Sequence, residues 1–360
     1  MRNPKKILLI IQRSNGDVFL SISLIKALYK FYNSPQIDLL VNEDTFQVAS
    51  LMPNINEIHT FSYKKKAQGR WQQERQLISK LFKKFDLSIN LTSSDRSVIY
   101  SLMAGRKSIS VVEKNHKKSW WKKILLSKYY FYDSSQHIMC QNLTTLALLK
   151  IKSDNVQKSI EISDNVLINV KNKLKGNDIK KFIIFHPSAQ YNYKILSKFL
   201  RDELLFKLSK LNIPIIVTGT NNKIDLYIKS ELPKLNNVFD FIGDTSLEEY
   251  FALSQLSLAY IGMDTLNMHI AASQNKRIFA IFGPTNLKMW SPWSNDLKKS
   301  ARVDMPIQTY SNISIFQADM PCVACGKKGC NNSGKSDCMD NINIQIIIEE
   351  VLLWLKNARL

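Results

Sequence analysis

The segment RSNGDVFLS places a carboxylate, Asp17, where an apolar run gives way to a helical pattern. The preceding KILLIIQ is typical of a buried strand, and the following VFLSISLIKALYKFY has the spacing of an amphipathic helix over 18–32. Strand-to-helix turns of this kind form the ligand crevice of open α/β sheets. A carboxylate there is suited to accept a proton from an attacking hydroxyl group. The alternative is that Asp17 only caps the helix, and the two roles are compatible.

Two segments in the second half of the chain are suited to bind a phosphate. In FHPSAQYNYK, Ser188 offers a hydroxyl and Lys194 an ammonium group at the start of a predicted helix. In YIGMDTLNMHIAAS, Asp264 and Thr265 are helix-capping residue types, and His269 follows one turn later on the same face. The functional interpretation is that both strand ends face one anionic ligand. The alternative is that Lys194 is solvated, Asp264 and Thr265 only cap, and His269 only packs.

Strand-like and helix-like runs alternate along the chain, which predicts parallel sheets with helices on both faces. One series of apolar runs ends at KSISVV, and a second begins at KFIIFHPS. We therefore expect two doubly wound domains, 1–175 and 176–343, joined in the lysine-rich stretch 170–181 and followed by a C-terminal helix within 344–360. Neither half carries a Gly-x-Gly-x-x-Gly turn or a P-loop, so an ordinary NAD or ATP fold is not expected.

The bulk composition limits the class of protein. A chain of 360 residues is long enough for two domains of average size. Its net charge of +20 indicates a polyanionic partner, such as nucleic acid, phosphorylated lipid or a nucleotide, or else a general bias toward lysine. No apolar run approaches the ~18 residues of a membrane span, and the first run is too short for a signal peptide. These features predict a cytoplasmic protein.

The first half is basic and aromatic. Residues 106–128 hold eight Lys or Arg against Glu113 alone, and residues 64–84 hold eight against Glu74 alone. Tryptophan and tyrosine interleaved with lysine suit a membrane interface, while the alternative is a solvated helix face with the aromatic rings in the core. Single-stranded nucleic acid also favours this composition. No nucleic-acid-binding motif accompanies it, so we expect no nucleic acid partner.

Four of the five cysteines form a late cluster with the spacing C-x2-C-x4-C-x7-C, whereas Cys140 stands alone in a helical pattern as a small core residue. Four thiolates in one short polar loop are suited to hold a structural zinc or iron ion. The alternative is four reduced thiols, because the cytoplasm disfavours stable disulfides. The candidate ligands are Cys322, Cys325, Cys330 and Cys338, in the loop 322–338.

The sequence resembles glycosyltransferase family 9, the ADP-heptose:lipopolysaccharide heptosyltransferases. The matching blocks, in chain order, are RSNGDVFLSISLIKAL, FDLSINLTSSDRS, HPSAQYNYK, FIGDTSLEEYFALSQLSLAYIGMDTLNMHIAA, IFGPT and CVACGKKGC. The resemblance implies a GT-B fold, in which two Rossmann-like domains flank an interdomain cleft, with the acceptor on the N-terminal domain and the nucleotide sugar on the C-terminal one. It implies inverting transfer of heptose from ADP-heptose to a lipopolysaccharide core acceptor without a catalytic cofactor.

The resemblance also implies a place in the cell and a set of site residues. Its acceptor is a phosphorylated glycolipid of the inner leaflet, so the protein is expected at the cytoplasmic face of the inner membrane, in peripheral contact with it. Asp17 corresponds to the proposed general base, and Arg96 to a candidate ligand of an acidic acceptor group. The residues assigned to the donor are Ser188, Lys194, Asp264, Thr265 and His269.

One position departs from the family pattern. Leu266 stands where the family has glycine, whose missing Cβ lets the backbone approach the phosphates. This departure keeps open a related transferase that uses another nucleotide sugar or a protein acceptor. From a different class of function, a catalytically inactive GT-B module that binds anionic glycolipid also fits the sequence.

Overall fold

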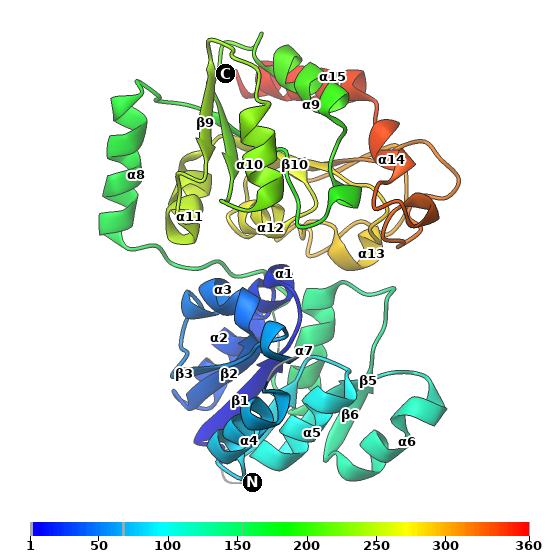
Figure 1. The fold of residues 1–360 in the computed structure, drawn as a ribbon. Coiled ribbons are helices and arrows are strands. Elements are labelled where there is room, and N and C mark those ends of the chain that lie inside the picture. Colours follow the sequence, from blue (N-terminus) through cyan, green and yellow to red (C-terminus); the bar gives the residue numbers. More distant parts are fainter. Residues whose placement is uncertain (1–2, 67–68, 153, 360) are drawn as a thin grey trace. The chain divides into compact units, whose positions relative to one another are not determined.

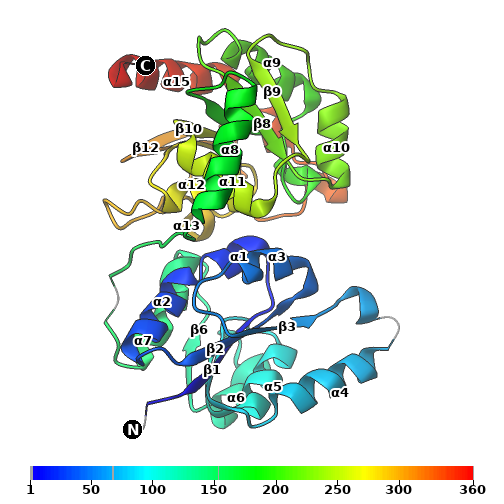
Figure 2. The same cartoon turned by 90° about the vertical axis from the view of Figure 1, so that its left-hand side faces the viewer.

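The computed structural model describes residues 3–66, 69–152 and 154–359, which divide into two compact units, Met1–Ile160 and Glu161–Leu360. The joint therefore lies before the position predicted from the lysine-rich stretch 170–181. Helix α8 (Asp164–Gly176) belongs to the second unit because it packs along α11 (Leu247–Leu256), as Figures 1 and 2 show. An ion pair of 3.0 Å between Lys173 Nζ and Asp244 Oδ2 supports this packing.

The first unit is built on a six-stranded parallel sheet with the order β3-β2-β1-β4-β5-β6 (Figure 1). The strand order reverses between β1 and β4. At such a point the connections that follow the two strands leave toward opposite faces of the sheet, and a crevice opens between them. The strands are β1 (Lys6–Ile11), β2 (Gln36–Asn42), β3 (Glu57–Phe61), β4 (Phe85–Asn90), β5 (Gly105–Val112) and β6 (Lys128–Phe131).

Helices cover this sheet, with α2 packed beside α7 and α4 packed beside α5. Their bounds are α1 (Asn15–Phe19), α2 (Ile22–Phe31), η1 (Glu43–Thr45), α3 (Phe46–Ser50), η2 (Lys64–Lys66), α4 (Arg70–Leu81), α5 (Asp95–Ala104), α6 (His116–Leu125) and α7 (Ile138–Leu148). The single helix predicted over 18–32 is wrong. The helix begins earlier, at Asn15, and breaks after Phe19, where the Ser21 hydroxyl donates to the Val18 carbonyl.

The second unit contains a seven-stranded sheet with the order β12-β13-β11-β10-β7-β8-β9, parallel except for the edge strand β12. Its order reverses between β7 and β10. The strands are β7 (Ile183–His186), β8 (Ile215–Gly219), β9 (Val238–Ile242), β10 (Ala259–Met263), β11 (Arg277–Ile281), β12 (Ile307–Tyr310) and β13 (Ile313–Phe316). The further helices are η3 (Asn192–Lys194), α9 (Lys198–Leu208), α10 (Lys223–Ser230), α12 (Leu266–Ser273), α13 (Leu287–Trp290), η4 (Cys330–Asn332), α14 (Asp337–Asp340) and α15 (Ile344–Ala358).

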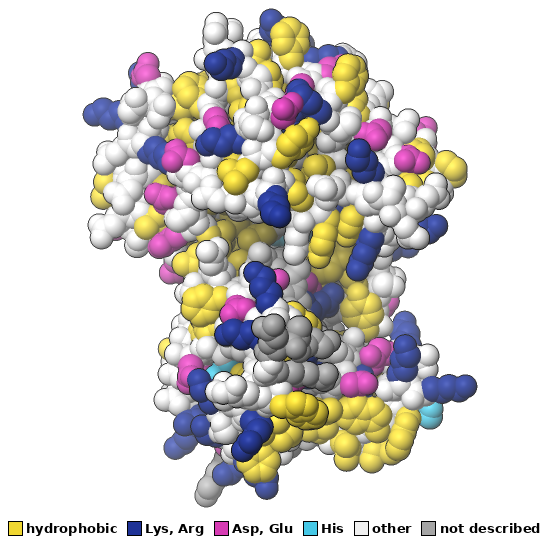
Figure 3. Space-filling view, viewed as in Figure 1, with side chains coloured by type: hydrophobic (Ala, Val, Ile, Leu, Met, Phe, Trp, Pro, Cys, Tyr) yellow, Lys and Arg dark blue, Asp and Glu magenta, His cyan; other side chains and the backbone are white. Residues whose placement is uncertain are grey.

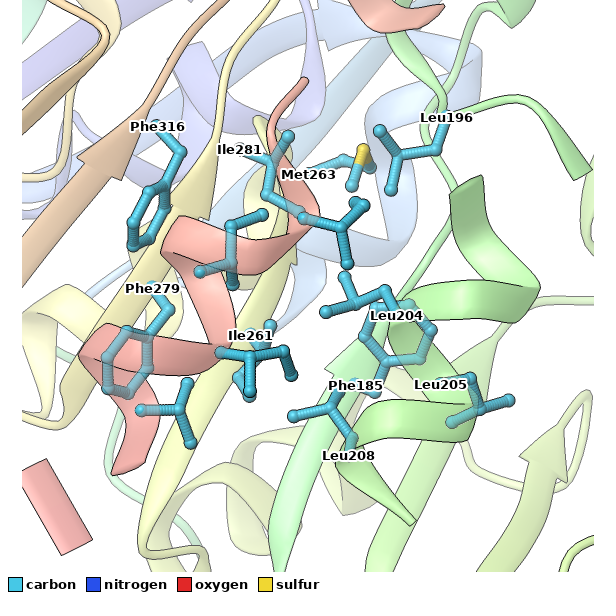
Figure 4. Packing of buried hydrophobic residues seen from close by; sticks show 14 of the residues in the cluster. Phe185, Leu196, Leu204, Leu205, Leu208, Ile261, Met263, Phe279, Ile281 and Phe316 are labelled. Atoms are coloured by element: carbon cyan, nitrogen blue, oxygen red, sulfur yellow. The ribbon is translucent and has the colours of Figure 1, made fainter. Parts of the chain in front are cut away.

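The central strands of the second sheet are apolar on both faces, as expected for parallel strands covered by helices. In Figure 4, Phe185 of β7 lies beside Leu204 and Leu208 of α9. Phe279 of β11 lies instead beside α15, where its ring meets that of Trp354 edge to face at 5.7 Å, and Ile261 of β10 lies between these two groups. Apart from Trp354, all of these side chains are fully buried. The core therefore fixes the carboxyl ends of β7 and β10 side by side, which is the edge where the predicted phosphate-binding segments begin.

Gly262, near the end of β10, shows how closely these two strands approach. A Cβ at this position would lie 2.4 Å from the carbonyl oxygen of His186 on β7, and neither backbone is free to move in a packed sheet.

We expect Gly262→Ala to lower the free energy of unfolding by about 1–3 kcal/mol, because the added methyl group must push β10 away from β7. Urea denaturation measures this loss. Gly176→Ala is the control, since its Cβ would meet open space at the end of α8. Equal stability of the two variants would contradict the close approach.

Candidate functional site

In the first unit, Asp17 lies in the first turn of α1 rather than before a helix, and it is 4% exposed. Its Oδ2 accepts hydrogen bonds from the backbone amide of Ser14 at 3.2 Å and from the Ser14 hydroxyl at 2.6 Å. Its Oδ1 pairs with Nε of Arg13 at 2.9 Å. Asp17 thus helps to cap α1, as one of the two predicted roles requires, and the same contacts hold its carboxylate in one orientation.

The loop after β4 lies directly beside the loop after β1. The amide of Gln12 donates to Thr92 Oγ1 at 3.0 Å, which joins the two loops at the point where the strand order reverses. Arg96, in the first turn of α5, belongs to this second loop region. Both residues that sequence reasoning assigned to the first unit, Asp17 and Arg96, therefore follow the carboxyl ends of adjacent strands.

Arg96 is held by aromatic rings. Its guanidinium carbon lies 3.9 Å from the ring centroid of Phe61 and 4.7 Å from that of Tyr63, and its Nη2 donates to the Tyr63 hydroxyl. Stacking of this kind fixes the plane of the guanidinium group, whose remaining N–H groups suit a carboxylate or phosphate. Phe61 and Tyr63 were not predicted as site residues, because their role depends on β3 lying near α5.

In the second unit, the structure brings Lys194 and Asp264 together across 70 positions of sequence. Lys194 Nζ lies 2.7 Å from Asp264 Oδ2. Burial disfavours the charged ammonium, but the carboxylate of Asp264 outweighs burial and raises the pKa of Lys194. Lys194 therefore stays charged at neutral pH. It lies in the 3-10 turn η3 rather than at the start of α9, so the predicted helix start at this residue is wrong.

Thr265 is the N-cap residue of α12, and its extended backbone turns the chain from β10 into the helix. In the described chain its side chain makes no capping hydrogen bond. The first amides of α12 thus remain available to an anionic ligand beside the Lys194 ammonium. Leu266 is the first residue of this helix and is half-buried, so its side chain borders the same place.

Two neutral histidines lie under this surface. Burial lowers the pKa of His269 to about 4, and it also lowers the pKa of His186 to about 4. The charge of Asp264 raises the pKa of His269 and the charge of Lys194 lowers it, so His269 lies near both residues, as predicted. The predicted His269 is therefore part of the cluster, but as an uncharged group.

Ser188 is buried, and its Oγ lies 3.4 Å from Nε2 of His186. The other ring nitrogen of His186 lies 3.0 Å from the Thr218 carbonyl and 3.1 Å from Nδ2 of Asn267 on α12. His186 thus ties the end of β7 to the first turn of α12. Sequence reasoning missed His186 and Asn267, although both occur in the quoted blocks, because the contact joins residues 81 positions apart.

The four cysteines of the loop 322–338 lie near one another, because burial and the neighbouring thiols of Cys325, Cys330 and Cys322 raise the pKa of the Cys338 thiol to about 11. Cys338 is buried, Cys330 is half-buried, and Cys322 and Cys325 are exposed. Among the described residues, the group of three or more His, Cys, Asp or Glu ligand atoms within 4.8 Å of one another is instead Asp38, Glu57 and His59. In that group Nε2 of His59 lies 3.3 Å from Oδ2 of Asp38, and Nδ1 of His59 lies 3.5 Å from Oε1 of Glu57. Both ring nitrogens of His59 therefore already have a carboxylate partner. A metal in the loop 322–338 stays a prediction.

The cysteine outside the cluster, Cys140 in α7, is half-buried rather than a core residue.

Comparison with known proteins agrees with this arrangement. The family model described as glycosyltransferase family 9 (heptosyltransferase) matches residues 74–311. The chain is 25% identical over 292 residues to lipopolysaccharide heptosyltransferase 3 of Escherichia coli, covering 79% of this chain and 85% of that protein. A 139-residue match to lipooligosaccharide heptosyltransferase 2 of Campylobacter jejuni, at 27% identity, covers 39% of this chain and 38% of that protein.

Solved structures share the fold. A glycosyltransferase family 9 protein from Veillonella parvula has a TM-score of 0.71 at 17% identity and covers 99% of this chain and 98% of its own. E. coli ADP-heptose lipopolysaccharide heptosyltransferase II has a TM-score of 0.70 at 17% identity, with coverage of 99% and 100%. E. coli heptosyltransferase WaaC with ADP has a TM-score of 0.63 at 15% identity, with coverage of 81% and 94%. These likenesses confirm two Rossmann-like domains of the GT-B type.

The two buried histidines predict how stability depends on pH. Each takes up a proton near pH 6.5 when the chain is unfolded but only near pH 4 when it is folded, so the free energy of unfolding falls as the pH falls through this window. From pH 6.5 to 5 we expect about 2 kcal/mol of loss per histidine. His269→Gln should show a shallower loss in urea denaturation, whereas His116→Gln, at an exposed position, should keep the native slope. A native slope in His269→Gln would contradict the neutral, buried ring.

Proposed function

The chain belongs to glycosyltransferase family 9, and from this premise we propose that it is an inverting heptosyltransferase that moves a heptose from ADP-heptose to a lipopolysaccharide core acceptor. The observation that carries the proposal is the Lys194–Asp264 pair beside the first turn of α12. The likeness to the E. coli heptosyltransferases, one of them solved with ADP, supports the choice of sugar and nucleotide.

The donor diphosphate binds at the first turn of α12 in this proposal. The Lys194 ammonium and the backbone amides of α12 face the phosphate oxygens, where negative charge grows as ADP leaves. Asp264 does not face the phosphates, since like charges repel, but it holds the ammonium in place at 2.7 Å. His269 stays neutral and lends no further positive charge, so Lys194 is the cation that the reaction uses.

Asp17 accepts the proton of the acceptor hydroxyl. The hydroxyl oxygen attacks the anomeric carbon and forms the new C–O bond, while the bond from that carbon to the β-phosphate oxygen breaks and ADP leaves with the electron pair. The proton moves to the Asp17 carboxylate, which Arg13 and Ser14 hold in orientation. This scheme needs no catalytic cofactor.

Arg96 binds an acidic group of the acceptor. Its stacked guanidinium follows β4, next to the loop that carries Asp17, and suits a phosphate of a phosphorylated glycolipid. Such an acceptor is anchored in a bilayer, so we place the protein at the cytoplasmic face of the inner membrane. Among the described residues, every helix is too short or too polar to span a bilayer.

A second candidate function is transfer from another nucleotide sugar. Leu266 favours it, because a half-buried side chain at the first position of α12 narrows the space in which glycine would let a phosphate approach.

Donor binding separates the two candidates. We expect ADP and ADP-heptose to raise the melting temperature, and UDP and GDP sugars to leave it unchanged.

Lys194→Met should weaken ADP binding about 10- to 100-fold, since it removes a charged hydrogen bond of about 1.5–3 kcal/mol. Lys198→Met is the matched control, because that lysine is exposed and pairs with Asp202. Stabilisation by a UDP or GDP sugar alone would favour the second candidate, and no response to any nucleotide sugar would overturn both.

The rate of heptose transfer tests the proposed role of Asp17 as the general base. We expect Asp17→Asn to bind ADP normally and to lose most heptose transfer, by about 100-fold or more, since an amide cannot take the proton. Asp17→Ala should lose the same activity and also about 1 kcal/mol of stability with the cap of α1. Transfer assays with single-turnover kinetics and urea denaturation measure the two effects. A near-native rate in Asp17→Asn would remove Asp17 from the mechanism.

A further inference from the structure

Helix α6 carries an uncovered apolar face. Trp120 is 52% exposed, Ile124 is 72% exposed and Leu125 is 59% exposed. Trp120 and Ile124 are four positions apart and so share one side of the helix. The alternative of a solvated helix face with its aromatic rings in the core therefore does not hold for Trp120. The half-buried Trp121 does pack inward, against the cluster of Val98, Val112 and Leu126.

A buried lysine on the opposite face keeps this apolar face outward. Lys122 is fully buried, and its Nζ lies 2.7 Å from Asp95 Oδ1, 2.8 Å from Glu113 Oε2 and 2.7 Å from the Ser93 carbonyl. Turning the helix to cover Trp120 would break these bonds and leave a buried charge without partners, which is strongly unfavourable. The exposure of the apolar face is thus a fixed property of the fold.

The same surface continues onto the edge strand β6. Phe131 is 42% exposed and Tyr129 is 37% exposed, and their rings meet edge to face at 5.7 Å. Lys123 of α6 places its Nζ 5.0 Å from the Phe131 ring centroid, which joins the two elements. Figure 3 shows hydrophobic side chains gathered on the first unit over the region of α4 to α6, with Lys and Arg around them.

The charge around this surface is mainly positive, with the carboxylate of Asp133 near Lys114. Lys114, Lys117 and Lys118 are exposed at the start of α6, and Lys128 is exposed at the start of β6. The acid within 106–128, Glu113, is already paired with the buried Lys122. An anionic partner is therefore attracted to the surface, whereas a second copy of the same surface is repelled.

We propose that α6 and β6 form a docking surface for an anionic lipid bilayer. Tryptophan and tyrosine are the side chains that favour the headgroup boundary, Ile124 and Leu125 reach the acyl region, and each lysine near anionic headgroups adds about 1 kcal/mol. Aliphatic side chains offer no stacking face to nucleic acid bases, so the chemistry favours lipid over single-stranded nucleic acid.

The docking surface lies beside the proposed acceptor residue. Lys122 joins α6 to Ser93 and Asp95, and Arg96 is the next residue along the chain. A glycolipid whose acyl chains stay in the bilayer thereby presents its headgroup near Arg96. This link rests on the proposed function, but bilayer binding itself does not require an acceptor and is measured without one.

Sedimentation of the full chain with vesicles tests the proposal. We expect binding to vesicles of phosphatidylcholine with 30% phosphatidylglycerol, about tenfold weaker binding to phosphatidylcholine alone, and loss of binding in high salt. The double variant Trp120→Ser, Ile124→Ser and the double variant Lys117→Glu, Lys118→Glu should each bind anionic vesicles at least tenfold more weakly. These four side chains are exposed, and circular dichroism checks that each variant is folded.

Phe206→Ser is the matched control, because Phe206 is 51% exposed and lies under Lys210 on the second unit. It should bind vesicles like the native chain. Equal binding by the α6 variants and this control would overturn the proposal, as would retention of an oligonucleotide in place of vesicles or dissociation of a dimer by the α6 variants. Transfer to an acceptor freed of its acyl chains should be unchanged in the α6 variants, so failure of bilayer docking is distinguishable from failure of the proposed function.

Discussion

Parallel strand pairing is the constraint on which the placement of the candidate residues within each unit depends. In each sheet the strand order reverses once, between β1 and β4 and between β7 and β10. Because parallel strands end at the same edge, the chain must deliver the residues after both strands of each pair to one place. Asp17 and Arg96 follow the first pair, and Lys194 and Asp264 follow the second. The close approach of β10 to β7 at Gly262 leaves little freedom in that placement.

The electrostatics of the second unit follow from this placement. One ammonium and one carboxylate lie in contact, and burial keeps the two histidines beneath them uncharged. The pair is nearly neutral as a whole, so the proposed attraction for a diphosphate rests on the direction in which Lys194 and the α12 amides point rather than on net charge. Leu266 stands at the first turn of that helix. Its side chain is therefore the feature of this chain that bears most directly on which nucleotide sugar fits.

Some groups combine a structural role with a proposed chemical one. Asp17 helps to cap α1, and the same hydrogen bonds from Ser14 fix the orientation of its carboxylate. Lys122 carries one of the many positive charges of the first half, yet it fixes α6 in place, while Lys117 and Lys118 on the same helix are exposed. The excess of positive charge is thus divided between a buried anchor and an exposed surface. The amino-acid composition does not distinguish these roles, because it counts a buried lysine and an exposed lysine alike.

The sequence by itself determined the alternation of strands and helices, the two parallel sheets and the candidate phosphate-binding segments that follow β7 and β10. These follow from local periodicity and from the rule that ligand residues follow strand ends. Tertiary structure alone decided that α8 joins the second unit, that the helix after β1 starts at Asn15 and breaks after Phe19, and that Lys122 is buried. It also paired His186 with Asn267. Each of these depends on partners distant in sequence, and the free energy of such a contact is set by packing and desolvation, which no local pattern records.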